Sequence, residues 1–492
     1  MTSFLGIDIG TSSIKAVLVG EGQAILADAS VKIEVQRPAP LWSEQDPEAW
    51  WQATLSAVAR VREAAPEAWR GLTAIGLSGQ QHGATLLGAR GEVLRPCILW
   101  NDGRSKAECA ELEARLPDFH RRAANLAMPG FTAPKLLWVA RHEPEVFAAT
   151  RMVLLPKDYV RYRLSGAYVS EMSDAAGTLW MDIPGRRWDG ALLAACGLNE
   201  AQMPRLVEGS DVSAMLSPEM ASLWGLADRQ IPIAGGGGDN ASSAVGIGAT
   251  GGGDGFLSLG TSGVIFAATD KPVALPERAL HGFCHALPGR WHGMVVVLSA
   301  ALSLDWIARL TGQAGDIAGF LARAERFAAE EGRRAHAPVF LPYLTGERTP
   351  HNDPLATAHF AGLTAEHEAD ALGYAVVEGV AFALADCLDV LVEADAAPRS
   401  CMLVGGGSRS AFWAQLISDV TGLTLHLPVG AEVGSAFGAA RLAMLAAGGS
   451  EAEVCVKPPV RRSFAPREGD APLLAQRRAR MQALYRRDTS AT

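Results

Sequence analysis

An aspartate lies inside an apolar segment near the start of the chain, just before a turn that can bind phosphate. Asp8 interrupts the run from Phe4 to Ile9, and Gly10-Thr11-Ser12 follows it. A carboxylate among apolar neighbours is costly unless it is paired or binds a cation. Successive N–H groups at such a turn bind phosphate oxygens, and Lys15 is a nearby cation. The pattern favours Mg²⁺ at Asp8 beside a nucleotide's phosphates; an edge-strand aspartate facing solvent is the alternative.

The same pattern recurs half a chain later. The segment from Ile7 to Ile14 aligns with the segment from Leu257 to Val264, which places Gly260-Thr261-Ser262 at the second turn. Two matched turns predict two similarly folded halves that present both turns to one cleft, unless the match is chance between ordinary hairpins. Residues 235–255 are rich in glycine, and we expect the chain to cross between the halves there.

Two glycine clusters follow short apolar segments. Asp239 comes after Gly235 to Gly238 and before a helical pattern, so it is either a placed catalytic carboxylate or a helix N-cap, and the two roles are compatible. Gly405-Gly406-Gly407-Ser408 follows the apolar run at 401–404 and precedes a helical segment. A strand, glycine loop and helix in this order bring backbone close to a nucleotide, although ordinary connections look the same.

A polar loop and several rejected motifs complete the chemical inventory. Trp100-Asn101-Asp102-Gly103-Arg104 combines an aromatic face with polar groups, as a polyol site requires and as an ordinary polar loop also does. The sequence has no Gly-Lys dipeptide and therefore no P-loop. The G-x-G-x-x-G at 246–251 lacks the strand and helix of a dinucleotide fold. The histidines and cysteine between 281 and 292 have no standard zinc spacing.

Short apolar runs and longer helical patterns alternate along the chain. We expect strands at 4–9, 14–19, 24–30, 72–77 and 401–404. We expect helices from about 47 and at about 371–394, 410–421 and 435–447. This alternation predicts an α/β protein with mixed sheets.

Composition excludes several classes of protein. The 492 residues are 49% apolar and 20% charged, which excludes a mainly disordered chain and allows about two or three domains. A net charge of −9 without a basic block disfavours nucleic-acid binding. Seven cysteines without a CxxC pair fit a reducing compartment. The start of the chain lacks a signal peptide's basic region, and the apolar stretch 294–304 is shorter than the roughly 20 residues of a membrane span. We therefore expect a soluble cytoplasmic protein.

Together these residues resemble the FGGY carbohydrate kinases, a family of the actin-like superfamily. Asp8 to Ser12 resembles the first phosphate motif of that family, Leu257 to Gly263 the second, and Leu403 to Ser408 the adenosine motif. The resemblance covers most of the chain and is strongest toward members that act on D-xylulose. The other matched segments are 41–47, 98–104, 128–138, 155–159, 172–177, 283–288 and 341–352.

The resemblance implies an α/β fold of two actin-like, ribonuclease H-like domains, 1–247 and 248–492, with mixed sheets flanked by helices and the active site in the cleft between them. It implies ATP-dependent phosphorylation of D-xylulose to D-xylulose 5-phosphate with Mg²⁺, Asp239 as catalytic base, and Asp8 and Asp239 toward the metal. The implied sugar ligands are Gln81, His82, Trp100, Asp102, Asp239 and Asn240. The implied ATP ligands are Gly10, Thr11, Ser12, Lys15, Gly260, Thr261, Ser262, Gly405, Gly406, Gly407 and Ser408.

Some alternatives stay open at this point. Gln81 stands where the family pattern has methionine, and the Gln81-His82 pair stands where glycerol kinases carry Arg-Glu. Kinases for ribulose, gluconate or glycerol are the nearest rivals, and a non-kinase actin-like ATPase is a more distant one. The segment after about residue 449 matches little and is expected to cover the second domain. The expected partners are a ketose and ATP, without nucleic acid or membrane, and a homodimer is one option for assembly.

Overall fold

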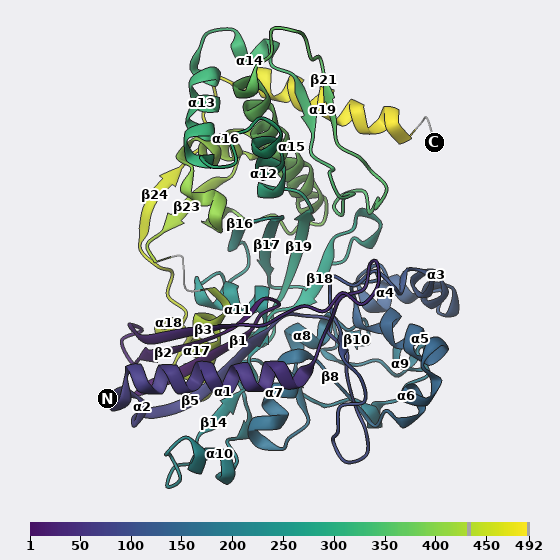
Figure 1. Ribbon diagram of the computed structural model, residues 1–492, viewed down its shortest axis with the longest axis vertical. Coiled ribbons are helices and arrows are strands. Elements are labelled where there is room, and N and C mark those ends of the chain that lie inside the picture. The colour runs from purple at the N-terminus through teal and green to yellow at the C-terminus, as the bar shows by residue number, and fades with distance from the viewer. Residues whose placement is uncertain (431–433, 490–492) are drawn as a thin grey trace.

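The protein forms two α/β halves, which lie one above the other in Figure 1. The computed structural model describes residues 1–430 and 434–489. Each half is built on one mixed seven-stranded sheet, as the alternating sequence pattern predicted.

The first sheet, in the lower half of Figure 1, has the order β13-β14-β5-β1-β2-β3, and β15 pairs with β5. β5 lies parallel to β1 and β14, whereas β2, β3 and β13 are antiparallel to their neighbours. Its strands are β1 (Ser3–Ile9), β2 (Ser13–Gly20), β3 (Ile25–Lys32), β5 (Leu72–Gly79), β13 (Val212–Met215), β14 (Pro232–Ala234) and β15 (Gly237–Gly238). The four strands predicted in this half are confirmed.

The second sheet has the order β18-β19-β17-β16-β22-β23-β24. β22 lies parallel to β16 and β23, and the other neighbours are antiparallel. Its strands are β16 (Gly255–Leu259), β17 (Gly263–Thr269), β18 (His281–Cys284), β19 (Trp291–Val297), β22 (Ser400–Val404), β23 (Thr424–Pro428) and β24 (Val460–Phe464).

The predicted internal repeat is confirmed, with a correction of one residue. In each half an antiparallel hairpin, β1–β2 or β16–β17, is joined through its first strand to a parallel strand, β5 or β22. Ile9 pairs with Ile14 across the first turn, but Leu259 pairs with Gly263 across the second. The second turn is therefore one residue shorter, and the alignment shifts by one residue after it.

Helices cover both faces of the first sheet. α1 (Pro47–Ala64) packs against β2 and β3, and α7 (Pro156–Ser165) packs against β5. On the opposite face lie α11 (Asp239–Gly246) and α17 (Gly434–Ala446). α17 approaches β1 so closely that a Cβ atom on Gly6 would lie 1.9 Å from the carbonyl oxygen of Ala436. Glycine in β1 thus permits this contact.

The chain returns to the first half near its end. α17 and α18 (Glu451–Val454) share an apolar cluster with the first sheet, and Figure 1 shows both helices beside that sheet. The predicted division at residues 247 and 248 stays a prediction, and segment 434–455 packs on the first sheet although it follows that division. The expectation that residues after 449 cover the second half is correct for β24 and wrong for α18.

Smaller elements extend the first half on the right of Figure 1. Helices α2 (Pro66–Trp69) and α10 (Pro218–Leu223) lie instead at the lower left of Figure 1 and share the apolar cluster of α1. The elements on the right are α3 (Lys106–Arg115), α4 (Phe119–Ala123), α5 (Thr132–His142), α6 (Pro144–Ala149), α8 (Met172–Ala176), α9 (Gly190–Ala195) and the strand pairs β4 (Glu44–Gln45) with β7 (Cys97–Ile98), β6 (Thr85–Leu87) with β8 (Met152–Leu154), β9 (Val169–Glu171) with β12 (Arg205–Val207), and β10 (Met181–Asp182) with β11 (Arg187–Trp188). Their apolar cluster includes side chains of β18, which joins the two halves on this side.

The second sheet is covered by helices at the top of Figure 1. They are α12 (Ala301–Leu310), α13 (Ile317–Ala329), α14 (Arg333–His336), α15 (Ala369–Glu393), α16 (Ala411–Thr421) and α19 (Ala471–Thr489), beside the strand pair β20 (Val339–Leu341) and β21 (His359–Ala361). The predicted helices at 371–394, 410–421 and 435–447 are confirmed as α15, α16 and α17. A buried ion pair of 2.6 Å between Arg477 and Glu378 holds α19 to α15. Within residues 1–430 and 434–489, no helix has both the length and the apolar character that a bilayer crossing requires.

Candidate active site

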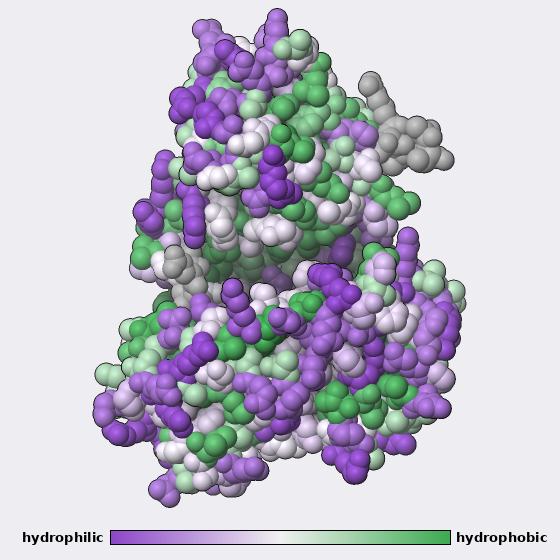
Figure 2. All heavy atoms as spheres, in the orientation of Figure 1, coloured by the Kyte–Doolittle hydropathy of each residue, from purple (hydrophilic) through white to green (hydrophobic). Residues whose placement is uncertain are grey.

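The predicted site residues follow the carboxyl ends of adjacent strands, where ligands bind in open α/β sheets. In the first sheet, β1 and β5 end together, with Ile9 opposite Gly79, and β15 ends beside them. In the second sheet, β16 and β22 are parallel, with Ser258 opposite Val404. The surface is hollowed between the two halves (Figure 2).

Both Gly-Thr-Ser turns leave backbone donors free. The N–H of Gly10 donates to Ser13 over 3.1 Å, and the N–H of Gly260 donates to Ser262 over 3.0 Å, which closes each turn. The amides of residues 11, 12, 261 and 262 have no hydrogen-bond acceptor within the described chain. Free successive amides of this kind suit an anion.

The two turns do not use their hydroxyls alike. The Thr11 hydroxyl donates to the Gln80 side chain over 3.0 Å and accepts from the Trp100 indole over 2.9 Å. It is therefore engaged inside the protein, and only the amide of Thr11 remains for a nucleotide. Ser12 and Thr261 are exposed.

Asp8 lies beside the first turn with one oxygen unsatisfied. Its Oδ1 atom is buried and has no hydrogen-bond partner in the described ranges. Burial raises the pKa of Asp8, although the hydroxyls of Ser435 and Ser78 and the charge of Lys15 oppose the rise. Lys15 is the direct cross-strand partner of Asp8, so both side chains lie on the same face of the hairpin. The position is compatible with the predicted role of Lys15 toward ATP, which stays a prediction.

Asp239 is the first residue of α11, and Gly238 is its N-cap, so the N-cap interpretation of Asp239 is wrong. The Asp239 Oδ1 atom accepts hydrogen bonds from the backbone and side-chain N–H groups of Asn240, at 2.7 and 3.0 Å. Its Oδ2 atom has no partner in the described chain. Burial, and then the nearby charge of Asp8, raise the pKa of Asp239 to about 7.

The two carboxylates fit a divalent cation. Asp8 has an orphaned buried oxygen, and Asp8 and Asp239 repel one another. Mg²⁺ is commonly held by one or two carboxylates together with substrate phosphates and waters. No cluster of three His, Cys, Asp or Glu residues that could hold a metal occurs among the described residues. The donor set therefore suits a cation that arrives with a nucleotide.

His82 is held as a neutral hydrogen-bond acceptor. It has a φ of +68°, and its Nδ1 lies 2.7 Å from the carbonyl oxygen of Gly177, which assigns the proton to Nδ1. Burial lowers the pKa of His82 to about 3. The Nε2 atom can thus accept from a substrate hydroxyl. Gln81 lies beside it, donates to Ser173 over 3.2 Å, and contacts Gly238.

Trp100 and Asp102, which were predicted together as sugar ligands, differ in their exposure. Trp100 is 48% exposed at the site. Asp102 is fully buried, and its oxygens accept hydrogen bonds from Ser43 at 2.6 Å and from the guanidinium of Arg104 at 2.7–3.0 Å. Asp102 therefore shapes the loop and presents no open oxygen to a sugar.

A cavity of about 670 Å³ adjoins the glycine loop after β22. Gly405, Gly406 and Ser408 line it, as predicted for an adenosine site. Gly407 does not, because a Cβ atom there would lie 2.5 Å from the Leu259 side chain. The Ser408 hydroxyl is already used, since it donates to the Gly405 carbonyl over 2.6 Å.

The same cavity has an apolar part and three unpaired cations. Its other lining residues include Ala411, Leu427, Pro428, Phe464, Arg409, Arg461 and Arg462. None of the arginines has a carboxylate partner within the described ranges, and the Arg462 guanidinium lies 4.7 Å from the centre of the Phe464 ring. An anionic ligand with a flat apolar group fits this lining. Sequence analysis missed Arg461 and Arg462 because β24 gave no motif, and it missed Arg409 although this residue directly follows the predicted glycine loop.

Sequence analysis missed three further residues that contact or influence the residues predicted to bind the sugar. The Lys135 ammonium donates to the His82 carbonyl over 2.8 Å, and burial lowers the pKa of Lys135 to about 7. The Ser173 hydroxyl accepts from the Gly238 amide over 3.1 Å, directly before Asp239. Arg348, from the second half, has its Nη1 atom 3.3 Å from Nε2 of His281. The charge of Arg348 also contributes to the lowered pKa of His82. Only the lone lysine among apolar residues at 133–139 was a sequence signal.

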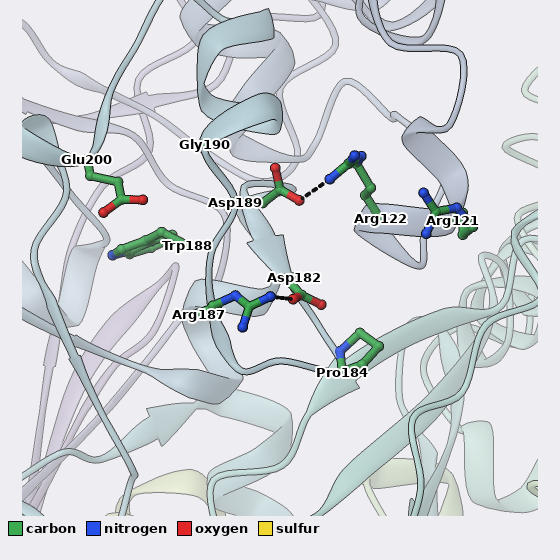
Figure 3. A pocket seen from close by; sticks show the side chains of 9 residues that line it. All are labelled: Arg121, Arg122, Asp182, Pro184, Arg187, Trp188, Asp189, Gly190 and Glu200. Atoms are coloured by element: carbon green, nitrogen blue, oxygen red, sulfur yellow. Dashed lines mark hydrogen bonds and ion pairs between the residues drawn. The ribbon is translucent and has the colours of Figure 1, made fainter.

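A separate open pocket of about 560 Å³ lies in the extension of the first half, and none of the predicted site residues line it (Figure 3). Its arginines already have carboxylate partners. Figure 3 shows Arg122 directed at Asp189 and Arg187 at Asp182, at 2.9 and 2.8 Å. Arg121 pairs with Asp118. This pocket therefore has no unpaired arginine to attract a phosphate.

Comparison with known proteins gives matches along nearly the whole chain. The N-terminal domain model of the FGGY family of carbohydrate kinases matches residues 3–246, and the C-terminal domain model matches residues 255–447. A xylulose kinase from Escherichia coli (strain K12) is 51% identical over 445 residues, 90% of each chain. One from Klebsiella pneumoniae is 50% identical over 444 residues, again 90% of each. A solved structure named as a xyloylose kinase from Brucella ovis has 46% identity and a TM-score of 0.95 over 100% of both chains.

The raised pKa of Asp239 predicts a pH-dependent cost to stability. The folded protein holds this proton up to about pH 7, whereas the unfolded chain releases it near pH 3.8, so the cost grows across that interval and is complete above it. Asp239→Asn should therefore raise the free energy of unfolding of the ligand-free protein by up to about 4 kcal/mol at pH 8, and by less than half as much at pH 5. Denaturant unfolding at both pH values measures this. An equal effect at the two values would contradict the assignment.

Proposed function

The chain belongs to the FGGY family of carbohydrate kinases, and from that membership we propose that it transfers the γ-phosphoryl group of ATP to D-xylulose and forms D-xylulose 5-phosphate. It is a carbohydrate kinase with the two-domain, actin-like fold of its family. The observation that carries the choice of acceptor is the 51% identity to a xylulose kinase over nine-tenths of both chains.

Asp239 is the proposed general base. Its free Oδ2 would accept the proton of the terminal hydroxyl as that oxygen attacks the γ-phosphorus in line. A pKa of about 7 keeps a large fraction of the group deprotonated at neutral pH and still basic enough to take a proton. Asn240 holds the other oxygen, which fixes the carboxylate plane.

His82 and its neighbours would orient the sugar. The Nε2 atom of His82 accepts a hydrogen bond from one hydroxyl, and the exposed face of Trp100 covers the carbon chain. Gln81 lies against Gly238, immediately before the base, where it would contact the end of the ketose that reacts. Asp102 would act only through the shape of the loop.

The nucleotide would extend between the two halves. The cavity at 405–408 fits the adenosine, and its unpaired arginines attract the anion. The free amides of the two turns would hold phosphate oxygens, together with Lys15. Mg²⁺, held at Asp8 and facing Asp239, would neutralise charge on the transferred group. Phosphoryl transfer depends mainly on such positioning and charge stabilisation.

Substrate preference is the direct test of this proposal. Among D-xylulose, D-ribulose, gluconate and glycerol, D-xylulose should give the highest kcat/KM in an ADP-release assay on the purified protein. ATP consumption without an acceptor should be at least 100-fold slower, because the base then has no hydroxyl to deprotonate. A higher kcat/KM for another acceptor would mean that the protein is a kinase of the same family for that acceptor. Turnover independent of any acceptor would contradict a sugar kinase.

Two aspartate variants separate the base from the metal site. Asp239→Asn cannot accept a proton and should lower kcat by about 10²–10⁴-fold, while the affinity for ATP stays near that of the unmodified protein. Asp8→Asn should also lose activity, but raising Mg²⁺ should restore part of it, because its role is toward the cation. Steady-state kinetics across a Mg²⁺ series distinguish them. Equal rescue of both variants would rule out separate roles.

A valine in the second turn should block only the nucleotide. A Cβ atom on Gly260 would meet nothing closer than the Ser262 carbonyl oxygen at 3.7 Å, so Gly260→Val should fold normally. Its side chain would project into the space proposed for phosphate. Calorimetry should then show loss of most ATP affinity with D-xylulose binding retained, whereas equal loss of both would mean a structural role only.

A further inference from the structure

A continuous row of side-chain hydrogen bonds runs from the core of the first half to the mouth of the site. The Trp50 indole N–H and the Gln80 side-chain amide both donate to Gln45 Oε1, at 2.9 and 3.0 Å. The Thr11 hydroxyl donates to Gln80 Oε1 over 3.0 Å, and the Trp100 indole donates to the Thr11 hydroxyl over 2.9 Å. We call this row, Trp50–Gln45–Gln80–Thr11–Trp100, the relay.

The direction of every bond in the relay is determined by chemistry. An indole N–H can only donate, so Thr11 accepts from Trp100 and directs its own proton to Gln80. That proton requires the Gln80 oxygen, and the Gln80 amide then faces the oxygen of Gln45. The remaining amide of Gln45 donates to the Thr11 carbonyl over 2.7 Å. Because Gln45 and Gln80 are 1% and 2% exposed, a lost bond is not readily replaced by water.

The relay joins two ligand sites that belong to different segments. Thr11 is in the middle of the first phosphate turn, whose amides are free, and Trp100 is the exposed aromatic residue of the sugar-side loop. Gln80 lies between them, directly before Gln81 and His82, and its own N–H donates to the Ile9 carbonyl over 2.9 Å. Any movement of the Trp100 ring toward a sugar must therefore act on the hydroxyl of the phosphate turn.

We propose that Gln80 and Thr11 are positioning residues that couple the sugar loop to the phosphate turn, so that a bound ketose fixes the turn in the geometry that binds the nucleotide. This inference rests on the proposed function, since it takes Trp100 to the ketose and the turn to ATP. The alternative is that Trp100 is only a platform for the sugar and that the hydroxyl of Thr11 only stabilises the fold.

Two small substitutions test the relay with little disturbance of the fold. Trp100→Phe keeps an aromatic face for the sugar and removes the N–H, and Thr11→Val removes the hydroxyl and keeps the backbone amide. Trp188→Phe is the matched control, because the Trp188 indole also donates over 2.9 Å, to the Pro204 carbonyl, but Trp188 lies in the separate pocket of Figure 3. Thermal unfolding of each variant verifies that it is folded.

The measurement is the Kd of a non-hydrolysable ATP analogue with Mg²⁺, without and with saturating D-xylulose. In the unmodified protein and in Trp188→Phe, the sugar should lower this Kd by about 2- to 10-fold, the range that one hydrogen bond supplies. In Trp100→Phe and Thr11→Val the ratio should fall toward one. The double variant should lose no more than either single variant, because both remove the same bond.

The outcomes separate the relay from the proposed function. If D-xylulose lowers the Kd of the analogue equally in all variants, the relay is wrong and the kinase assignment stands. The same holds if the two substitutions reduce this effect additively in the double variant. A change in the KM for D-xylulose alone in Trp100→Phe would favour the platform alternative and also overturn it. Absence of nucleotide binding in the unmodified protein would contradict both.

Discussion

The burial of two nearby carboxylates, Asp8 and Asp239, is the constraint on which the rest of the site depends. Burial raises the pKa of both, and the charge of Asp8 adds to the rise at Asp239, whose pKa reaches about 7. Such a pair is unfavourable for folding, and it suits the base near neutral pH and the cation site that we propose. The surrounding structure must therefore hold the carboxylates of Asp8 and Asp239 near each other although their charges repel.

Close backbone packing holds them. β1 carries Asp8, β15 leads directly to Asp239, and both strands pair with β5. α17 then covers this face from the far end of the chain, and glycine makes the approach possible: a Cβ atom on Gly438 would lie 1.7 Å from the carbonyl oxygen of Ser242 in α11. The helix that follows the second sheet thus fixes the site of the first. A segment that follows the second sheet thus packs beside both carboxylates of the candidate site.

The sugar side is supported by buried polar groups in place of apolar packing alone. α8 supplies the Ser173 hydroxyl to the Gly238 amide and is followed by Gly177, whose carbonyl accepts from His82. Beneath it, Lys157 is fully buried and lies 2.8 Å from both Asp158 and Asp174. The orientation of His82 and Asp239 thus depends on polar contacts from several elements together.

The sequence by itself determined the strands and the two matched turns, and it singled out the two carboxylates that we propose for the reaction. A lone Asp8 in an apolar strand and Asp239 after four glycines are local signals, because their cost is visible from their immediate neighbours. Repetition of the hairpin made the two-half architecture predictable as well. These features depend on residues that are adjacent in the chain.

Only the tertiary structure decided which polar atoms remain free for ligands. Thr11 and Asp102 have suitable groups in the sequence, but Gln80 and Trp100 engage the first, and Ser43 and Arg104 enclose the second. Conversely, Arg462 carries no motif, yet β24 brings it to the cavity beside the glycine loop, where we propose the nucleotide. The physical reason is that a hydrogen-bonding group is available only if no other group satisfies it first, and except for Arg104 the partners named here come from distant parts of the chain.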